Sequence, residues 1–244
     1  MKEYELSTGQ NQRMGDSVKR TSNYSEQGLF RKEVLSFTQE KAKAFSLLFV
    51  PPAEGGGMEI SMMRVIAGTA RSLRLKAPEG LDTRPTTDRI KETLFNMLMP
   101  YLGDAVFVDL FSGSGAIGIE AISRGAKKAY FVENAQKAVD CITDNVKHTR
   151  FEEQSVIVKQ DVFAALRGSI KDTADVIFME PPYDHEYEKH ALEILKDANY
   201  VTEDTLIVVE ASIDTDFSYV SDLGFEITKE KVYKTNKHVF IRRS

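Results

Sequence analysis

The sequence predicts an α/β fold: a mostly parallel seven-stranded sheet that ends in an antiparallel hairpin, preceded by a small N-terminal β-hairpin. From residue 106 onward, short apolar segments alternate with amphipathic ones. Repeated strand–helix–strand units of this kind form a parallel sheet with helices on both faces. The last two strand segments are joined by residues 234–237, a short connection with an asparagine that is typical of a hairpin.

The start of the chain has two interpretations. Residues 1–57 contain few aliphatic residues up to position 43 and no sustained hydrophobic period, so they are predicted to be disordered. The run from Glu54 through three glycines to Met58 suggests an alternative, because its purine-rich codons would resemble a bacterial ribosome-binding site ahead of a start codon. In that case residues 1–57 are a translated leader, and the native chain begins at Met58.

Residues 58–100 are predicted to form a basic hairpin and a helix. Two short alternating segments around Gly68 are typical of a hairpin. Apolar residues from Ile90 to Leu98 recur at helical spacing, and Pro100 ends this helix.

The predicted sheet occupies residues 101–244 and forms the main domain. Its strands are expected at 106–110, 128–133, 155–158, 176–179, 206–210, 225–233 and 238–242. The helices between them are expected at 116–124, 136–148, 162–166 and 187–198.

Composition limits the classes of protein to which this chain can belong. With 42% hydrophobic and 28% charged residues, 244 residues suffice for one globular domain and an appendage. No apolar run approaches the roughly 18 residues of a membrane span, and no signal peptide is expected. Cys141 is the only cysteine and the four histidines lack metal-ligand spacing, so we expect no disulfide framework, no metal site and a reducing, cytoplasmic location.

The charge of the chain is unevenly distributed. The net formal charge of −5 argues against a nucleic-acid partner, whereas residues 62–91 carry seven basic and three acidic residues. A basic segment on an acidic body is compatible with phosphate contacts, although scattered surface charges would give the same composition. The candidate nucleic-acid-binding residues are Arg64, Arg71, Arg74, Lys76, Arg84 and Arg89.

A glycine-rich turn after the first predicted strand indicates a nucleotide-like cofactor. Gly113, Gly115 and Gly118 satisfy the dinucleotide fingerprint, and Glu133 lies about twenty residues further on, as a ribose-binding acid does. The fingerprint alone also fits a nicotinamide cofactor. Asp109 favours S-adenosyl-L-methionine instead, because a carboxylate here would repel a pyrophosphate but meet the methionine ammonium directly or through water.

A third acid, Asp161, follows the third predicted strand, where it can accept from an adenine amino group. A purely structural alternative is that the glycines allow a tight turn and the acids cap helices, with Asp161 as the N-cap of the next helix. The predicted cofactor-binding residues are Asp109, Phe111, Gly113, Gly115, Glu133, Asn134, Asp161 and Val162.

The run Glu180, Pro181, Pro182 and Tyr183 after the fourth strand predicts the reacting part of the site. The prolines fix the backbone and remove two amide donors, so the carbonyls there and the Glu180 side chain can accept from an exocyclic NH2 group. The Tyr183 ring offers a surface for base stacking, worth about 1–3 kcal/mol. Catalysis would then come mostly from holding the amine lone pair against a sulfonium methyl group, so these four residues are the predicted catalytic residues.

Several runs between Met63 and Tyr183 carry a family resemblance. They are Arg64-Val-Ile-Ala-Gly68, Leu73-x-Leu-Lys-Ala-Pro78, Thr83-Arg-Pro-Thr-Thr-Asp-Arg89, Asp109-Leu-Phe-Ser-Gly-Ser-Gly115 and Pro181-Pro-Tyr183. Through them the chain resembles the bacterial small-subunit (16S) ribosomal RNA guanine-N2-methyltransferases over about three quarters of its length.

The resemblance implies a Rossmann-like S-adenosylmethionine-dependent methyltransferase fold over residues 101–244. It implies methylation of N2 of one guanine in small-subunit ribosomal RNA, within an assembling subunit. We expect a monomer with no membrane partner. The positions named above would serve the cofactor and the base, residues 84–89 would lie over the site, and the N-terminal hairpin would grip the RNA.

The sequence departs from this family at Glu180, where the family carries Asp. Glu is one methylene longer, and a misplacement of about 1 Å can cost about a hundredfold in rate. An active enzyme with a shifted loop, a slow enzyme and an RNA-binding protein without catalysis all stay open. An adenine-N6 DNA or RNA methyltransferase is an alternative, because the motif suits any exocyclic amine, and a nicotinamide oxidoreductase is a more distant one.

Two residues near the predicted site have no settled role in the sequence. Glu210 ends the fifth predicted strand at the same edge, where pocket lining, a helix cap and a surface contact all fit. His185 follows the reacting loop and is a candidate proton acceptor.

Overall fold

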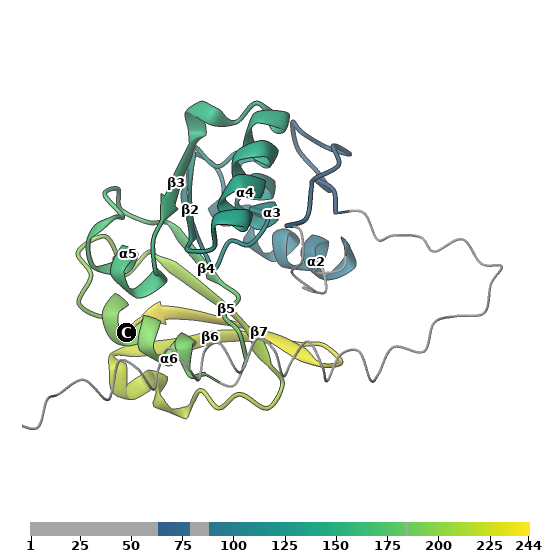
Figure 1. Ribbon diagram of the computed structural model, residues 1–244. Helices are drawn as coiled ribbons and strands as arrows, with labels where there is room; N and C mark the ends of the chain where they lie inside the picture. The colour runs from purple at the N-terminus through teal and green to yellow at the C-terminus, as the bar shows by residue number, and fades with distance from the viewer. Residues whose placement is uncertain (1–62, 79–87, 184) are drawn as a thin grey trace, which may run out of the picture. The chain divides into compact units, whose positions relative to one another are not determined.

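A seven-stranded sheet with strand order β3-β2-β1-β4-β5-β7-β6 forms the centre of the protein (Figure 1). The computed structural model describes residues 63–78, 88–183 and 185–244, so segment 1–57 and Arg84 lie outside the described residues. The five strands from β1 to β5 are parallel, and β7 runs antiparallel to both β5 and β6. The strands are β1 (Val106–Leu110), β2 (Lys128–Glu133), β3 (Ser155–Lys159), β4 (Val176–Met179), β5 (Leu206–Ser212), β6 (Phe225–Val232) and β7 (Asn236–Arg243).

The predicted fold class is therefore confirmed, with helices in the connections as expected. The α-helices are α2 (Asp88–Leu98), α3 (Ala116–Ser123), α4 (Gln136–Thr149), α5 (Val162–Gly168) and α6 (Tyr187–Leu195). The structure also contains the short 3-10 helices η1 (Met99–Tyr101), η2 (Glu152–Gln154) and η3 (Ser218–Leu223). Within the described ranges, no helix combines the length and the apolar character needed to cross a bilayer.

Helices cover both faces of the sheet, which explains why its central strands are almost wholly apolar. α2, α3 and α4 share one hydrophobic core with Phe107, Phe131 and Phe178 (Figure 1). α5, α6 and η3 share the other core with Val108 and Ile177. Because successive strand residues point to opposite faces, neighbouring residues of one strand enter different cores.

Residues 63–78 form the predicted hairpin, with very short pairing. Arg64 and Arg74 make an isolated antiparallel bridge, and the Leu75 amide donates to the Met63 carbonyl at 2.8 Å. Val65 and Leu75 are buried in the same core as α2 and α3. The hairpin therefore packs against α2 and α3.

Strand β5 runs two residues beyond its predicted end. Ala211 and Ser212 continue to pair with Lys237 and Asn236 of β7. This extension carries Glu210 inside the sheet, opposite His238, instead of leaving it at a free strand end.

Candidate cofactor and substrate site

The two predicted motifs lie at the carboxyl ends of neighbouring parallel strands. Leu110, the last residue of β1, pairs with Met179, the last residue of β4. The glycine turn follows β1 and the run 180–183 follows β4, so the structure brings the motifs side by side. Open parallel sheets bind their ligands at this edge.

The turn between β1 and α3 is built from left-handed backbone. Phe111, Gly113 and Gly115 have φ values of +59°, +54° and +76°. This conformation is cheap for glycine but costs roughly 1–3 kcal/mol for a residue with a side chain. The strain at Phe111 supports a functional turn, because such residues cluster at ligand sites.

Gly118, the third glycine of the fingerprint, has a packing role. A Cβ atom at this position would lie 2.4 Å from Cε1 of the Phe131 ring. Only glycine therefore lets α3 pack this closely on β2. Close packing of helix on strand is the role expected of the third glycine in the dinucleotide fingerprint.

Glu133 holds the glycine turn in place. Its Oε2 atom accepts from the Gly113 amide at 3.0 Å. Its Oε1 atom accepts from the amides of Asn134 and Ala135 at 2.8 and 2.9 Å. The predicted ribose-binding acid thus lies against the glycine-rich turn, while the neighbouring Asn134 is exposed.

Asp109 lies beneath the turn, and its contact with the methionine ammonium, directly or through water, stays a prediction. The residue is 2% exposed, and its Oδ2 atom accepts from the Gly118 amide at 3.0 Å. Burial raises the pKa of Asp109 to about 7, opposed by the Gly118 hydrogen bond and helped by the charge of Glu133. Its direct role is to join β1 to the start of α3.

The raised pKa of Asp109 predicts a pH-dependent stability. At a pH above the pKa of Asp109 in the unfolded chain, the native protein keeps a proton that the unfolded chain releases. The free energy of unfolding should therefore fall as pH rises from about 4 to about 7. Asp109→Asn should flatten this decline by on the order of 3 kcal/mol while its amide oxygen still accepts from Gly118. Urea denaturation at pH 4.5, 6 and 8 measures this, with the exposed Asp204→Asn as control. Parallel profiles for the wild type and Asp109→Asn would contradict it.

Asp161 caps helix α5. Its Oδ1 atom accepts from the Ala164 amide at 3.1 Å, which confirms the N-cap interpretation. Val162, the next residue, is buried. A contact between Asp161 and an adenine amino group stays a prediction.

An aromatic cluster that the sequence did not reveal links three strand ends. The ring of Tyr187, at the start of α6, stacks on Phe111 at 6.0 Å and on His185 at 5.1 Å. Phe163 meets Tyr187 edge-on at 5.6 Å and His190 at 4.3 Å. In the sequence, the only sign of this cluster is that its rings lie within a few residues of predicted strand ends. Ordinary core residues often occupy the same positions.

The run 180–183 offers both a rigid backbone and an accessible ring. Pro181 is buried, Glu180 is half-buried and Pro182 is exposed. Tyr183 is 38% exposed. Burial raises the pKa of the Tyr183 hydroxyl to about 12, and the charges of Glu210 and Glu180 add to the effect. The ring is therefore neutral, a hydrogen-bond donor and open enough for stacking.

Glu210 neither caps a helix nor lies on the surface. It is 3% exposed and pairs with His238, which is fully buried, at 2.8 Å between Oε2 and Nε2. The two residues are 28 positions apart in the sequence, which gives no sign of the β5–β7 pairing that brings them together.

Among the described residues of the basic segment, every cation except Lys91 is exposed. Arg64, Arg71, Arg74, Lys76 and Arg89 are exposed. Two of them form surface ion pairs, Arg64 with Asp88 at 2.8 Å and Lys76 with Asp144 at 2.7 Å.

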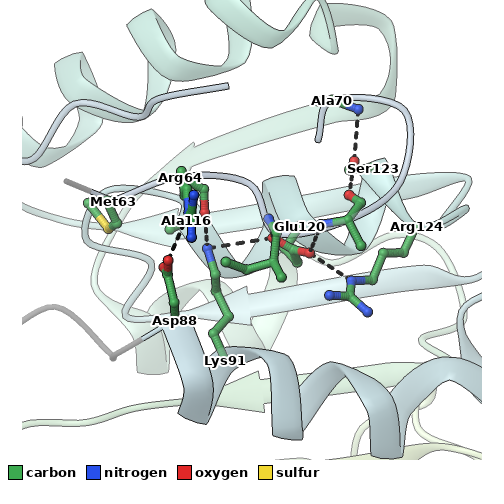
Figure 2. A network of polar contacts seen from close by, with 12 residues as sticks. Met63, Arg64, Ala70, Asp88, Lys91, Ala116, Glu120, Ser123 and Arg124 are labelled. Atoms are coloured by element: carbon green, nitrogen blue, oxygen red, sulfur yellow. Dashed lines mark hydrogen bonds and ion pairs between the residues drawn. The ribbon is translucent and has the colours of Figure 1, made fainter. Parts of the chain in front are cut away.

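Lys91 differs, because its side chain is 2% exposed and lies 3.5 Å from Glu120. Figure 2 shows how Glu120 connects the hairpin, α2 and α3. Its carboxylate accepts from the amides of Ile66 and Ala67 and from Arg124 Nε at 2.7, 3.0 and 2.7 Å. The segment's seven basic residues therefore overstate its basic surface, and Lys91 serves to anchor the hairpin.

A metal centre finds no support in the described ranges. No group of three His, Cys, Asp or Glu side chains is close enough there to hold an ion. Cys141 is buried, and its thiol donates to the Lys76 carbonyl at 3.3 Å.

Comparison with known proteins gives a consistent result. Residues 63–242 match the family model described as Conserved hypothetical protein 95. The chain is 33% identical over 171 residues to ribosomal RNA small subunit methyltransferase D of Haemophilus influenzae, covering 69% of this chain and 88% of the relative. The protein of the same name from Escherichia coli K12 is 31% identical, with 70% and 84% covered. The structure of the hypothetical protein TTHA0928 from Thermus thermophilus superposes with a TM-score of 0.62 at 28% identity, covering 72% and 97%.

Proposed function

Because the chain belongs to the family described as Conserved hypothetical protein 95, we propose that it methylates small-subunit ribosomal RNA. Relatives in Haemophilus influenzae and Escherichia coli carry the name ribosomal RNA small subunit methyltransferase D. The methyl donor is S-adenosyl-L-methionine, and the acceptor is the exocyclic N2 amine of one guanine. The protein acts as a monomer on RNA of an assembling subunit.

The observation that carries this proposal is the pairing of Leu110 with Met179. It sets a strained, glycine-rich turn beside a rigid acidic and aromatic loop. A turn with a nearby ribose-binding acid suits the nucleoside of the cofactor, and the loop suits a flat base with an amino group. Bringing both reactants together supplies most of the rate enhancement that such a transfer needs.

The chain's own residues have separate tasks in this mechanism. Glu133 and the glycine turn bind the cofactor, Tyr183 stacks on a base swung out of its RNA, and Glu180 accepts from the amine. When bound, S-adenosylmethionine supplies the electrophilic methyl group. The exposed arginines of the hairpin and Arg89 contact RNA phosphates, which makes binding sensitive to salt.

Transfer of labelled methyl groups tests the proposal. The full chain is incubated with radiolabelled S-adenosylmethionine and small-subunit RNA from cells that lack this protein, and the RNA is digested to nucleosides. We expect the label in N2-methylguanosine, with none in plasmid DNA. Label in N6-methyladenosine would identify the adenine-directed activity instead, and no heat of S-adenosylmethionine binding in calorimetry would contradict the methyltransferase proposal.

A further inference from the structure

A buried acid and a buried histidine lie next to the predicted base-binding loop without a role so far. Glu210 of β5 and His238 of β7 occupy opposed positions in the antiparallel register. His238 Nε2 lies 2.8 Å from Glu210 Oε2, and Asn236 Nδ2 donates to the other oxygen, Oε1. The acid lies on β5 and both donors lie on β7, the strand that pairs with β5 in the antiparallel part of the sheet.

The hydrogen bonds around Glu210 suit a carboxylate with a permanent negative charge. Tyr233 Oη lies 3.2 Å from His238 Nδ1. A tautomer with its proton on Nε2 accepts from Tyr233 and donates to Glu210, which satisfies each group. Both Glu210 oxygens are thereby engaged by N–H donors, which fixes the position of the carboxylate.

The strand register sets Glu210 beside Glu180. Met179 of β4 pairs with Val209 of β5, so the next residues in each chain segment are neighbours. Phe178 of β4 and Val208 of β5 belong to the same core. Side chains alternate along a strand, so Glu210 lies on the face of Val208. Because residues before a proline favour extended backbone, we expect Glu180 to continue the alternation of β4 on this same face. Neighbouring strands lie roughly 4.8 Å apart.

The electrostatics of Tyr183 independently indicate that this charge reaches the site. Burial is the main cause of the raised pKa of its hydroxyl, and Glu210 is the next cause, ahead of Glu180. Two acids from adjacent strands thus act on the ring on which a base is expected to stack.

We propose that Glu210, held by His238 and Asn236, stabilises the positive charge that develops on the substrate amine during methyl transfer. This inference rests on the proposed function. The nitrogen lone pair forms the new N–C bond as the S–C bond breaks, and the sulfonium becomes a neutral thioether. The nitrogen is cationic until its proton passes to Glu180, which is half-buried and hands it to water. A fixed charge at this place favours the transition state more than the neutral substrate.

Removing the charge without changing the shape tests this role. Glu210→Gln should lower the single-turnover rate of methyl transfer at least tenfold, with KM values for S-adenosylmethionine and RNA within twofold of wild type. Glu230→Gln, which removes the same charge from an exposed position on β6, is the matched control and should keep the wild-type rate. A wild-type rate in Glu210→Gln would overturn the inference.

A second variant separates charge from packing. His238→Gln keeps an N–H donor for Glu210 and leaves its charge intact, so its rate should stay within about threefold of wild type. A loss as large as that of Glu210→Gln would show that the pair acts through packing and would overturn the inference.

Tyr183 provides a readout that needs no activity. In protein with 13C-labelled tyrosine, Glu210→Gln should lower the titration midpoint of the Tyr183 hydroxyl relative to wild type and Glu230→Gln. If the wild type methylates no RNA, the proposed function fails and this inference fails with it. If the wild type methylates RNA, an unchanged midpoint in Glu210→Gln overturns the inference alone and leaves the proposed function standing.

Discussion

Replacing Glu120 by alanine should lower the free energy of unfolding by about 3–5 kcal/mol, one of the two largest effects that we expect. The Glu120 side chain is fully buried, and those of Lys91 and Arg124 are 2% and 6% exposed. Burial lowers the pKa of Lys91, and the charges of Glu120 and Asp88 oppose this shift. Without Glu120, two cations and two backbone amides would lose their shared acceptor, which costs more than the net worth of the pairs.

The effect should be local as well as global. The amides of Ile66 and Ala67 donate directly to Glu120, so their hydrogen exchange should accelerate most. Urea denaturation gives the global change, and exchange measured by mass spectrometry gives the local one. Glu153→Ala, at an exposed position, is the control and should change stability by less than about 0.5 kcal/mol. An unchanged denaturation midpoint in Glu120→Ala would mean that the hairpin is anchored by its apolar contacts alone.

Much of the sheet could be predicted because its strands are short apolar runs bounded by glycine, proline or acids. β1, β2 and β4 begin and end as expected, since both of their faces are buried and the change to polar residues is abrupt. β5 was predicted too short because its last residues pair with β7, and cross-strand pairing leaves no local trace in the sequence.

The candidate site was predictable only where one segment carries all of its parts. The turn with Gly113 and Gly115 and the run 180–183 are contiguous, so their chemistry is visible in the sequence. Glu210 and His238 come from different strands, and only the register unites them. The stack of Phe111 on Tyr187 was missed for the same reason.

Charge counts were misleading where burial decides the role of a residue. Lys91 was counted with the basic segment, yet it faces the core and pairs with Glu120. Asp109 is likewise buried and accepts from Gly118, while its contact with the cofactor stays a prediction. A sequence does not show which charged groups are removed from water.

The structure also limits how the longer Glu180 side chain can be accommodated. Met179 is the last residue of β4 and is paired on both sides, to Leu110 and to Val209. Pro181 is buried and cannot rotate about φ. Since the backbone is held before and after Glu180, we infer that the pocket is shaped for glutamate and that the loop has little freedom to retract.

Glu180→Asp should therefore lower the methyl-transfer rate by about a hundredfold, because the carboxylate would withdraw by roughly 1 Å from the substrate amine. Binding of S-adenosylmethionine should not change, since the glycine-rich turn lies between β1 and α3 and is held by Glu133 of β2. Single-turnover kinetics and calorimetry measure the two quantities, with the exposed Glu203→Asp as a control for the same chemical change. A faster Glu180→Asp enzyme would show instead that the native glutamate is a handicap, and equal rates would show that the loop moves to compensate.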